Sequence, residues 1–169
     1  MKDFLIYILV PLLILVIVAA IMAGMITGMI TVAQAEEGYD LRTVSGITAE
    51  ELRPYMHPES RHLAEDVVRI CNECEISAEF IATVMRWERR PDLHNWFGWT
   101  NNRGRLMRFA TDEQCLRTII PRIKQMYLTE GGRYFNGYTV AAVSRYYNNS
   151  AFWRNTIERG MMRIVEGTK

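Results

Sequence analysis

The sequence is poor in metal-binding residues and has almost no excess charge of either sign. Its histidines, His57, His62 and His94, are dispersed and lack the spacing of metal ligands. Lys and Arg number 20 against 19 Asp and Glu, so the strongly basic surface of a nucleic-acid-binding protein is absent. The chain also has no internal repeat and no low-complexity tract. We therefore expect no bound metal, no cofactor and no nucleic-acid partner.

Cysteine is also scarce, with only Cys71, Cys74 and Cys115. The Cys71-x-x-Cys74 motif has no second CxxC or His pair nearby, which gives a zinc site little support, and a thioredoxin-like motif would need a βαβ context that the pattern does not show. We expect Cys71 and Cys74 to lie on the same side of one helix. Two interpretations stay open: small buried apolar residues, or a disulfide from Cys115 to one of the pair in an exported domain.

A long uncharged run occupies residues 4–32. About 20 apolar residues span a bilayer, whereas a cleaved signal peptide has an apolar core of about 7–15 residues. Ala33-Gln34-Ala35 nevertheless ends in a pattern that signal peptidase can cut. We predict that residues 1–35 are a transmembrane anchor or uncleaved signal, with a secreted product if cleavage follows Ala35. The short N-terminal tail favours a single-pass membrane protein with its N-terminus in the cytoplasm and its domain outside.

The remaining chain predicts a polar linker, residues 36–46, and one domain, residues 47–169. Capping residues and apolar spacing predict six helices. The first begins at Thr48, the second runs from Glu59 to about Glu75, and the third runs from Ser77 to near Arg90. The fourth runs from Thr111 to Gly131-Gly132 with a kink at Pro121, and the last two begin at Thr139 and Ser150. Residues 91–110 have the turn residues of a loop, with a small hairpin at most. The predicted fold class is mainly α with a small, reduced β lobe.

The most informative segment is IATVMRWERRPDLHNWFGW, residues 81–99. Glu88 ends an apolar helical stretch and is followed by Trp96, Phe97, Gly98 and Trp99. A carboxyl group partly withdrawn from water at such a place can keep a proton near neutral pH, as a general acid must. Aromatic side chains beside it suit stacking on sugar rings. The combination indicates cleavage of a glycosidic bond.

Several segments, in order, resemble a known family: ITAEELRPYM, AEFIATVMRWE, LHNWFGW, FATDEQCLRTIIPRIKQMYL and FNGYTVAAVSRYYNNSAFWRNTI. Together they resemble the bacterial glucosaminidase family of peptidoglycan hydrolases over residues 47–165. The resemblance implies a lysozyme-like α fold and places the catalytic glutamate of the family at Glu88. The family's Asn-Leu-Phe-Gly-like segment corresponds to Asn95-Trp96-Phe97-Gly98, its cleft tyrosine to Tyr146 or Tyr147, and its terminal Tyr…Trp pattern to Tyr147 and Trp153.

The sequence departs from that family directly after the acid. Arg89-Arg90-Pro91-Asp92 stands where the family has small residues, and the two arginines either pair with Glu88 or point toward anionic groups of the cell wall. Asp92 is the only acid between Glu88 and Phe109, so it is the candidate second carboxylate. The 2-acetamido group of the substrate is the alternative nucleophile, because two-carboxylate mechanisms have such exceptions.

The candidate substrate-binding residues are Trp96, Phe97, Trp99, Asn101 and Asn102. For the aromatic residues the competing interpretation is core packing beneath a cleft. We expect Phe97 to be core, and Trp96 or Trp99 to stack on sugar. For the two asparagines the competing interpretation is turn chemistry.

These observations predict an endo-β-N-acetylglucosaminidase that cleaves the β-1,4 glycan backbone of peptidoglycan after N-acetylglucosamine, with Glu88 as general acid. Its partners would be the glycan strands and, through the N-terminal helix, the membrane. Local wall remodelling or lysis beside a secretion, conjugation or phage machine would suit such an enzyme. One alternative is a muramidase or lytic transglycosylase on the same fold. Another is a non-catalytic cell-wall-binding or assembly protein.

Overall fold

The computed structural model describes residues 38–168. Within that range no helix has the length and apolar character to cross a membrane. The predicted transmembrane run of residues 4–32 lies outside the described residues.

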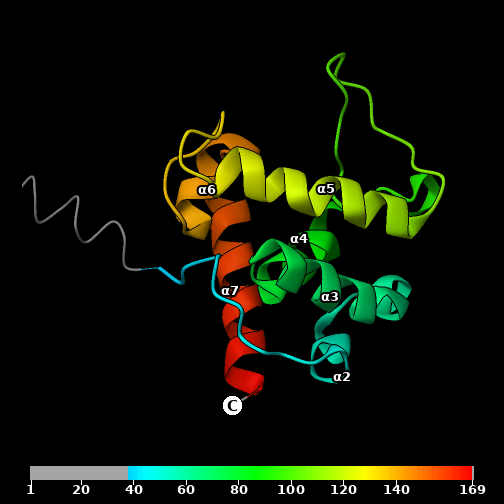
Figure 1. Ribbon diagram of the computed structural model, residues 1–169, viewed down its shortest axis with the longest axis vertical. Helices are drawn as coiled ribbons and strands as arrows, with labels where there is room; N and C mark the ends of the chain where they lie inside the picture. The colour runs from blue at the N-terminus through cyan, green and yellow to red at the C-terminus, as the bar shows by residue number, and fades with distance from the viewer. Residues whose placement is uncertain (1–37, 169) are drawn as a thin grey trace, which may run out of the picture. The chain divides into compact units, whose positions relative to one another are not determined.

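The described chain is mainly helical, as predicted (Figure 1). The elements in order are α2 (Ala49–Leu52), η1 (Arg53–Tyr55), η2 (Pro58–Leu63), α3 (Ala64–Cys74), α4 (Ala78–Glu88), η3 (Pro91–Leu93), α5 (Asp112–Tyr127), α6 (Val140–Tyr147) and α7 (Ala151–Gly167). In residues 38–168, β structure is limited to two isolated antiparallel bridges, Arg90 with Asn95 and Thr100 with Leu106. The predicted hairpin is thus reduced to a loop with two cross-bridges.

The predicted caps are confirmed at five helix starts. A hydroxyl group accepts a backbone N–H three residues on at each of Thr48, Ser77, Thr111, Thr139 and Ser150. At Thr48 the capping box is complete. At Thr111 it is not, because Gln114 Oε1 accepts from the N–H of Ala110, at 2.7 Å, one residue earlier than predicted.

The ends of some helices differ from the prediction. The helix expected from Glu59 begins as 3₁₀ helix at Pro58 and becomes α-helix only at Ala64. Helix α5 continues through Pro121 and ends at Tyr127, before the glycine pair. Gly132 instead closes a turn, where its N–H donates to the carbonyl of Thr129 at 2.8 Å.

Helix α4 forms the centre of the core. All its residues from Ala78 to Met85 are buried, and it packs against α2, α3 and α7. The buried Glu79 accepts a 2.8 Å hydrogen bond from the hydroxyl of Ser77, which offsets part of its desolvation. In Figure 1, α5, which packs on α3, is drawn horizontally and α7 is drawn vertically. Glu88 is the last residue of α4 and lies where this buried helix leaves the core.

The first described residues contact the domain at Tyr39 and Leu41. The side chain of Leu41 is fully buried, its N–H donates to the carbonyl of Tyr138 at 2.8 Å, and its carbonyl accepts from the N–H of Ser77 at 2.7 Å. Tyr39 also packs against the core. Residues 42–46 are exposed, and the compact unit begins at Tyr39.

The three cysteines are free thiols. Cys71 and Cys74 lie near the end of α3, as predicted, and Cys71 and Cys115 are buried. Burial raises the pKa of Cys71 well above its ordinary value and that of Cys115 to about 12. The structure therefore fits the interpretation of Cys71 and Cys115 as small buried apolar residues.

Candidate active site

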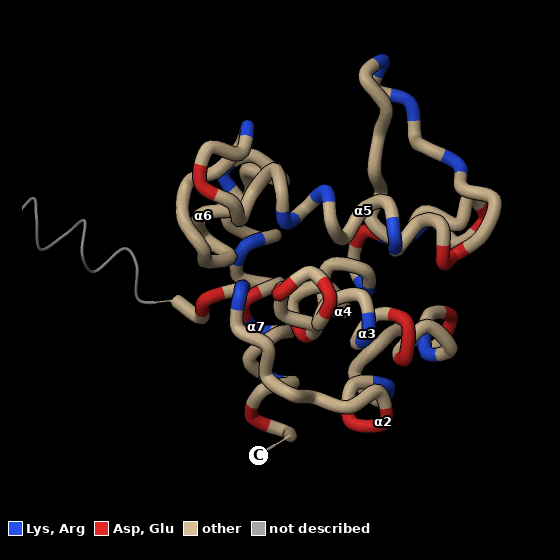
Figure 2. The backbone as a smooth tube through the Cα atoms, viewed as in Figure 1, with Lys and Arg blue, Asp and Glu red and all other residues tan. Residues whose placement is uncertain are grey.

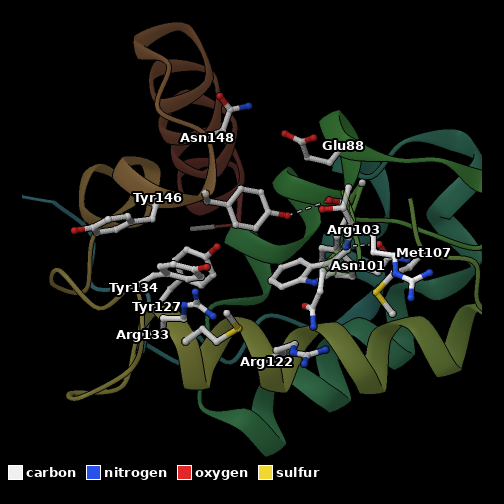
Figure 3. Close-up of a pocket in the computed structure, with 17 residues that line it drawn as sticks. Glu88, Asn101, Arg103, Met107, Arg122, Tyr127, Arg133, Tyr134, Tyr146 and Asn148 are labelled. Carbon is white, nitrogen blue, oxygen red and sulfur yellow. Dashed lines mark hydrogen bonds between the residues drawn. The ribbon is translucent and has the colours of Figure 1, made fainter. Parts of the chain in front are cut away.

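A pocket of about 1000 Å³ opens beside the end of α4 (Figure 3). Its walls come from Glu88, from the loop that follows η3, from α5 and the loop after it, and from the end of α6. These segments are far apart in the sequence. The pocket is therefore a product of the tertiary fold.

Of the lining residues within 38–168, Glu88 is the only acid. It is the last residue of α4 and is half-buried. Its Oε1 accepts a hydrogen bond of 2.7 Å from Nε1 of Trp153 on α7. In Figure 3 its carboxylate lies on the side of the pocket opposite to Arg122 and Arg133. The fold thus presents one carboxylate, held by one indole, to a large cavity.

Gly98 permits the loop to approach this carboxylate closely. Its φ is +59°, and an added Cβ would lie 3.0 Å from the Glu88 carbonyl oxygen and 3.3 Å from Glu88 Oε2. Asn95, which is fully buried, shapes the same loop: its amide donates to the carbonyls of Trp99 and Met107, both at 2.9 Å, and accepts from the N–H of Trp99 at 2.9 Å. The Asn-x-x-Gly spacing therefore builds the loop wall next to Glu88.

Tyr147, predicted to be catalytic, lies in the pocket wall. Its ring stacks on Trp153 with centroids 5.3 Å apart, and its hydroxyl donates to the carbonyl of Phe97 at 3.1 Å. Burial, with the nearby charge of Glu88, raises the pKa of Tyr147 well above its ordinary value. The phenol therefore stays protonated near neutral pH. Its ring contacts the Trp153 indole and its hydroxyl contacts the loop beside Glu88.

Tyr146, the other predicted tyrosine, lies at the open end of an aromatic run. It is 58% exposed and stacks on Tyr134 with centroids 5.7 Å apart. Tyr134 packs on Tyr127 at 5.2 Å, and Tyr127 packs on Tyr147 at 5.7 Å. The run continues to Trp153 and so leads from solvent to Glu88. Such faces suit the apolar sides of sugar rings.

The predicted tryptophans divide between the pocket and the core. Trp99 lines the pocket and contacts Tyr147 edge-on at 5.9 Å. Trp96 is 2% exposed and is not a lining residue, because its Nε1 donates to Asp112 Oδ1 at 2.8 Å. Its placement therefore gives no support to stacking on sugar. Phe97 is buried, as expected of a core residue, and also lines the pocket.

The predicted polar residues are also divided. Asn101 and Asn102 are exposed and line the pocket, and Asn101 Oδ1 accepts from the N–H groups of Arg103 and Arg105 at 2.9 and 3.1 Å. Turn chemistry thus occupies the side chain of Asn101. Asp92 is exposed and outside the pocket lining. The structure does not bring this candidate second carboxylate together with Glu88.

The arginines after Glu88 are turned to other partners. Arg89 Nε lies 3.3 Å from Glu59 Oε2, and Arg90 Nη1 donates to the carbonyl of Arg89 at 2.9 Å. Among the ion pairs of residues 38–168, none joins Glu88 to either arginine. The carboxylate is therefore left to the pocket and to Trp153.

A second polar cluster surrounds Asp112 at the start of α5. Asp112 Oδ1 lies 2.6 Å from His94 Nδ1, and Oδ2 lies 3.2 Å from His62 Nε2. Burial raises the pKa of Asp112, but the hydrogen bonds from His94, Trp96 and His62 outweigh it and leave the pKa below its ordinary value. In the described part of the chain, no group of three or more His, Cys, Asp or Glu residues is placed to hold a metal ion.

Sequence reasoning missed several residues of the site. Trp153 was placed only by resemblance, and its bond to Glu88 joins residues 65 positions apart. The lining residues without a predicted role are Thr100, Arg103, Met107, Arg122, Met126, Tyr127, Arg133, Tyr134 and Asn148. They come from separate loops and helices, so the sequence gives no signal that they share a cavity. Comparisons with family models, with curated proteins and with solved structures find no match to this chain.

Proposed function

We propose that the protein cleaves the β-1,4 glycan backbone of peptidoglycan, with Glu88 as general acid. The observation that carries the proposal is a single, indole-bound carboxylate in a large pocket whose aromatic run extends to solvent. The aromatic side chains that reach the pocket, with Tyr146 at its open end, can pack on the apolar sides of sugar rings. A lysozyme-like fold for residues 47–169 is part of the proposal.

In this mechanism Glu88 donates its proton to the glycosidic oxygen as the bond from that oxygen to the anomeric carbon breaks. Its carboxylate then becomes negative, and the N–H of Trp153 stabilises the new charge. The same carboxylate afterwards takes a proton from the attacking water. Glu88 thus serves as acid and then as base.

The pocket lining supplies no second acid. Two-carboxylate glycosidases hold their carboxyl groups about 5–5.5 Å apart when retaining and about 6.5–9.5 Å apart when inverting. The lone carboxylate therefore favours attack on the anomeric carbon by the 2-acetamido oxygen of the substrate. The bond cleaved in this proposal follows N-acetylglucosamine.

The same lone carboxylate supports a second candidate, a lytic transglycosylase. There the C6 hydroxyl of the sugar attacks its own anomeric carbon, so neither water nor a second acid is needed. Glu88 would first protonate the leaving oxygen and then accept the hydroxyl proton. The non-catalytic alternative receives less support, because Glu88 faces a pocket instead of bridging to Arg89 or Arg90.

The proposed place of action is the outer side of the cell membrane, with residues 4–32 as anchor. An anchored enzyme would cut only nearby glycan, which suits the opening of a local path for a secretion, conjugation or phage machine. The uncharged length of residues 4–32 supports the anchor.

The test is digestion of purified peptidoglycan by the full-length chain in detergent, beside Glu88→Gln. The variant removes the acidic proton but keeps an oxygen that can accept from Trp153, so its fold is preserved. Mass spectrometry of the products identifies the bond: a reducing N-acetylglucosamine end for a glucosaminidase, a reducing muramic end for a muramidase, or an anhydromuramic end for a transglycosylase. Release of sugar by wild type alone supports the proposal. Release by neither protein, or equally by both, overturns it.

A further inference from the structure

Three arginines face the same pocket as the single acid. Arg103 comes from the loop after η3, Arg122 from α5 and Arg133 from the loop after α5. All three are exposed residues. Figure 2 shows further basic positions, and no acidic one, along the loop between Trp99 and Thr111. The pocket lining thus carries an excess of positive charge, three arginines against one acid, although the whole chain is nearly neutral.

Among the described residues, these three arginines line the pocket without an acidic partner of their own. Arg42, Arg69 and Arg117, by contrast, each pair with a carboxylate. Among the ion pairs of residues 38–168, none involves a pocket arginine. Like charges around one cavity repel each other, so a neutral ligand would leave the arrangement unfavourable. An anionic ligand would relieve the repulsion.

The position of Arg133 joins this charge to the aromatic run. Its guanidinium carbon lies 5.3 Å from the centre of the Tyr134 ring, and Tyr134 stacks on Tyr146. A sugar ring lying on these tyrosines would carry its substituents within reach of the guanidinium. Guanidinium groups bind carboxylates through two parallel N–H···O bonds, a geometry that lysine cannot reproduce.

We propose that Arg122 and Arg133, assisted by Arg103, bind carboxylate groups carried by the glycan, so that the pocket selects an acidic glycan over a neutral one. This inference rests on the proposed function, because it takes the ligand to be a glycan strand. The carboxylate has two possible sources: the lactyl acid of the sugar itself, or the acid groups of an attached peptide. Both present the same chemistry to the arginines.

The test measures binding by isothermal titration to full-length Glu88→Gln in detergent, which avoids turnover. Three tetrasaccharides serve as probes: neutral chitotetraose, a peptide-free muramoyl tetrasaccharide with free lactyl acids, and the same glycan with peptides attached. The variant Arg122→Gln with Arg133→Gln is compared in the same background. Arg163→Gln is the matched control, since Arg163 is an exposed residue of α7 outside the pocket lining.

An exposed ion pair changes affinity by about 2- to 5-fold, so the double variant should weaken binding of an acidic glycan by roughly 4- to 25-fold. Binding of chitotetraose should stay unchanged, the control should match its parent, and added salt should weaken only the acidic probes. If the double variant loses more affinity for the peptide-free glycan, the bound carboxylate is that of the lactyl group. If it loses more affinity for the peptide-bearing glycan, the bound carboxylate belongs to the peptide.

Equal affinity for all three tetrasaccharides, or equal weakening of all three in the double variant, overturns the charge selection while leaving glycan cleavage intact. Failure of every tetrasaccharide to bind, together with failure of wild type to release sugar from peptidoglycan, overturns the proposed function and this inference with it. The two failures are thus distinguished by whether chitotetraose binds.

Discussion

Replacement of Gly98 by alanine tests how closely the loop must approach the acid. The residue has a φ of +59°, which costs an L residue about 1–2 kcal/mol of folding free energy. Its new Cβ would lie 3.0 Å from the carbonyl oxygen of Glu88 and 3.3 Å from Oε2. The first contact is closer than the about 3.5–4.0 Å at which carbon atoms pack best, and it involves backbone. Loop and carboxylate must therefore separate by several tenths of an ångström.

Gly104→Ala is the matched control for this prediction. Its φ is +71°, and nothing lies within 4 Å of an added Cβ. Both variants should lose about 1–2 kcal/mol of unfolding free energy through the backbone. Gly98→Ala should lose more, and its kcat should fall at least about 10-fold, which corresponds to roughly 1.4 kcal/mol of transition-state stabilisation.

The assay combines thermal unfolding, followed by circular dichroism in one detergent, with the initial rate of sugar release from peptidoglycan. Gly104→Ala should keep a rate close to that of wild type. Equal loss of stability and equal rates in the two variants would refute the close approach of the loop to Glu88. A rate loss in Gly104→Ala as large as that in Gly98→Ala would also refute it, because only one glycine touches the acid.

Further predictions concern the indole, the Asp112 cluster and the thiols. Trp153→Phe keeps an aromatic ring but removes the donor to Glu88, so kcat should fall about 10-fold while unfolding free energy falls by about 1 kcal/mol; an unchanged rate would contradict the stabilisation of the Glu88 charge by Trp153. Because the folded pKa of Asp112 lies below its ordinary 3.8, its carboxylate stabilises the fold above that pH, and the contribution disappears as pH falls toward the folded pKa. Asp112→Asn should therefore lower stability at neutral pH by about 1–3 kcal/mol and flatten the stability curve below that value, and parallel curves would contradict it. Cys74, the partly exposed thiol, should react with a disulfide reagent in the folded protein before the two buried thiols, as peptide mapping of the labelled protein would show.

Local hydrogen bonding explains which parts of the fold were predictable. The caps at Thr48, Ser77, Thr139 and Ser150 depend on a hydroxyl and an N–H only three residues away, and all four are confirmed. The burial of Leu41 depends on partners in other parts of the chain, so its polar neighbours gave no signal of it. Pattern reasoning works where the partner is near in sequence.

The candidate site shows the same division. Glu88 could be predicted because an apolar helix leads to it and aromatic residues follow it. Whether Trp96 or Trp99 faces the pocket could not be predicted, because the indole N–H of Trp96 donates to Asp112, sixteen residues on, in the core. The positive lining formed by Arg122 and Arg133 was also beyond prediction. Only the folded chain brings them to the pocket that Glu88 also lines.

The hydrogen bonds at Leu41 limit how far the folded domain of the proposed enzyme can lie from the end of its proposed membrane anchor. The backbone of Leu41 is hydrogen-bonded to Tyr138 and to Ser77, and eight residues lie between it and Val32, the last residue of the uncharged run. Even a fully extended chain of that length spans no more than about 30 Å. With residues 4–32 held in a membrane, as proposed, the domain would reach new glycan by lateral diffusion in the bilayer. It would not reach layers of the wall that lie far from the membrane.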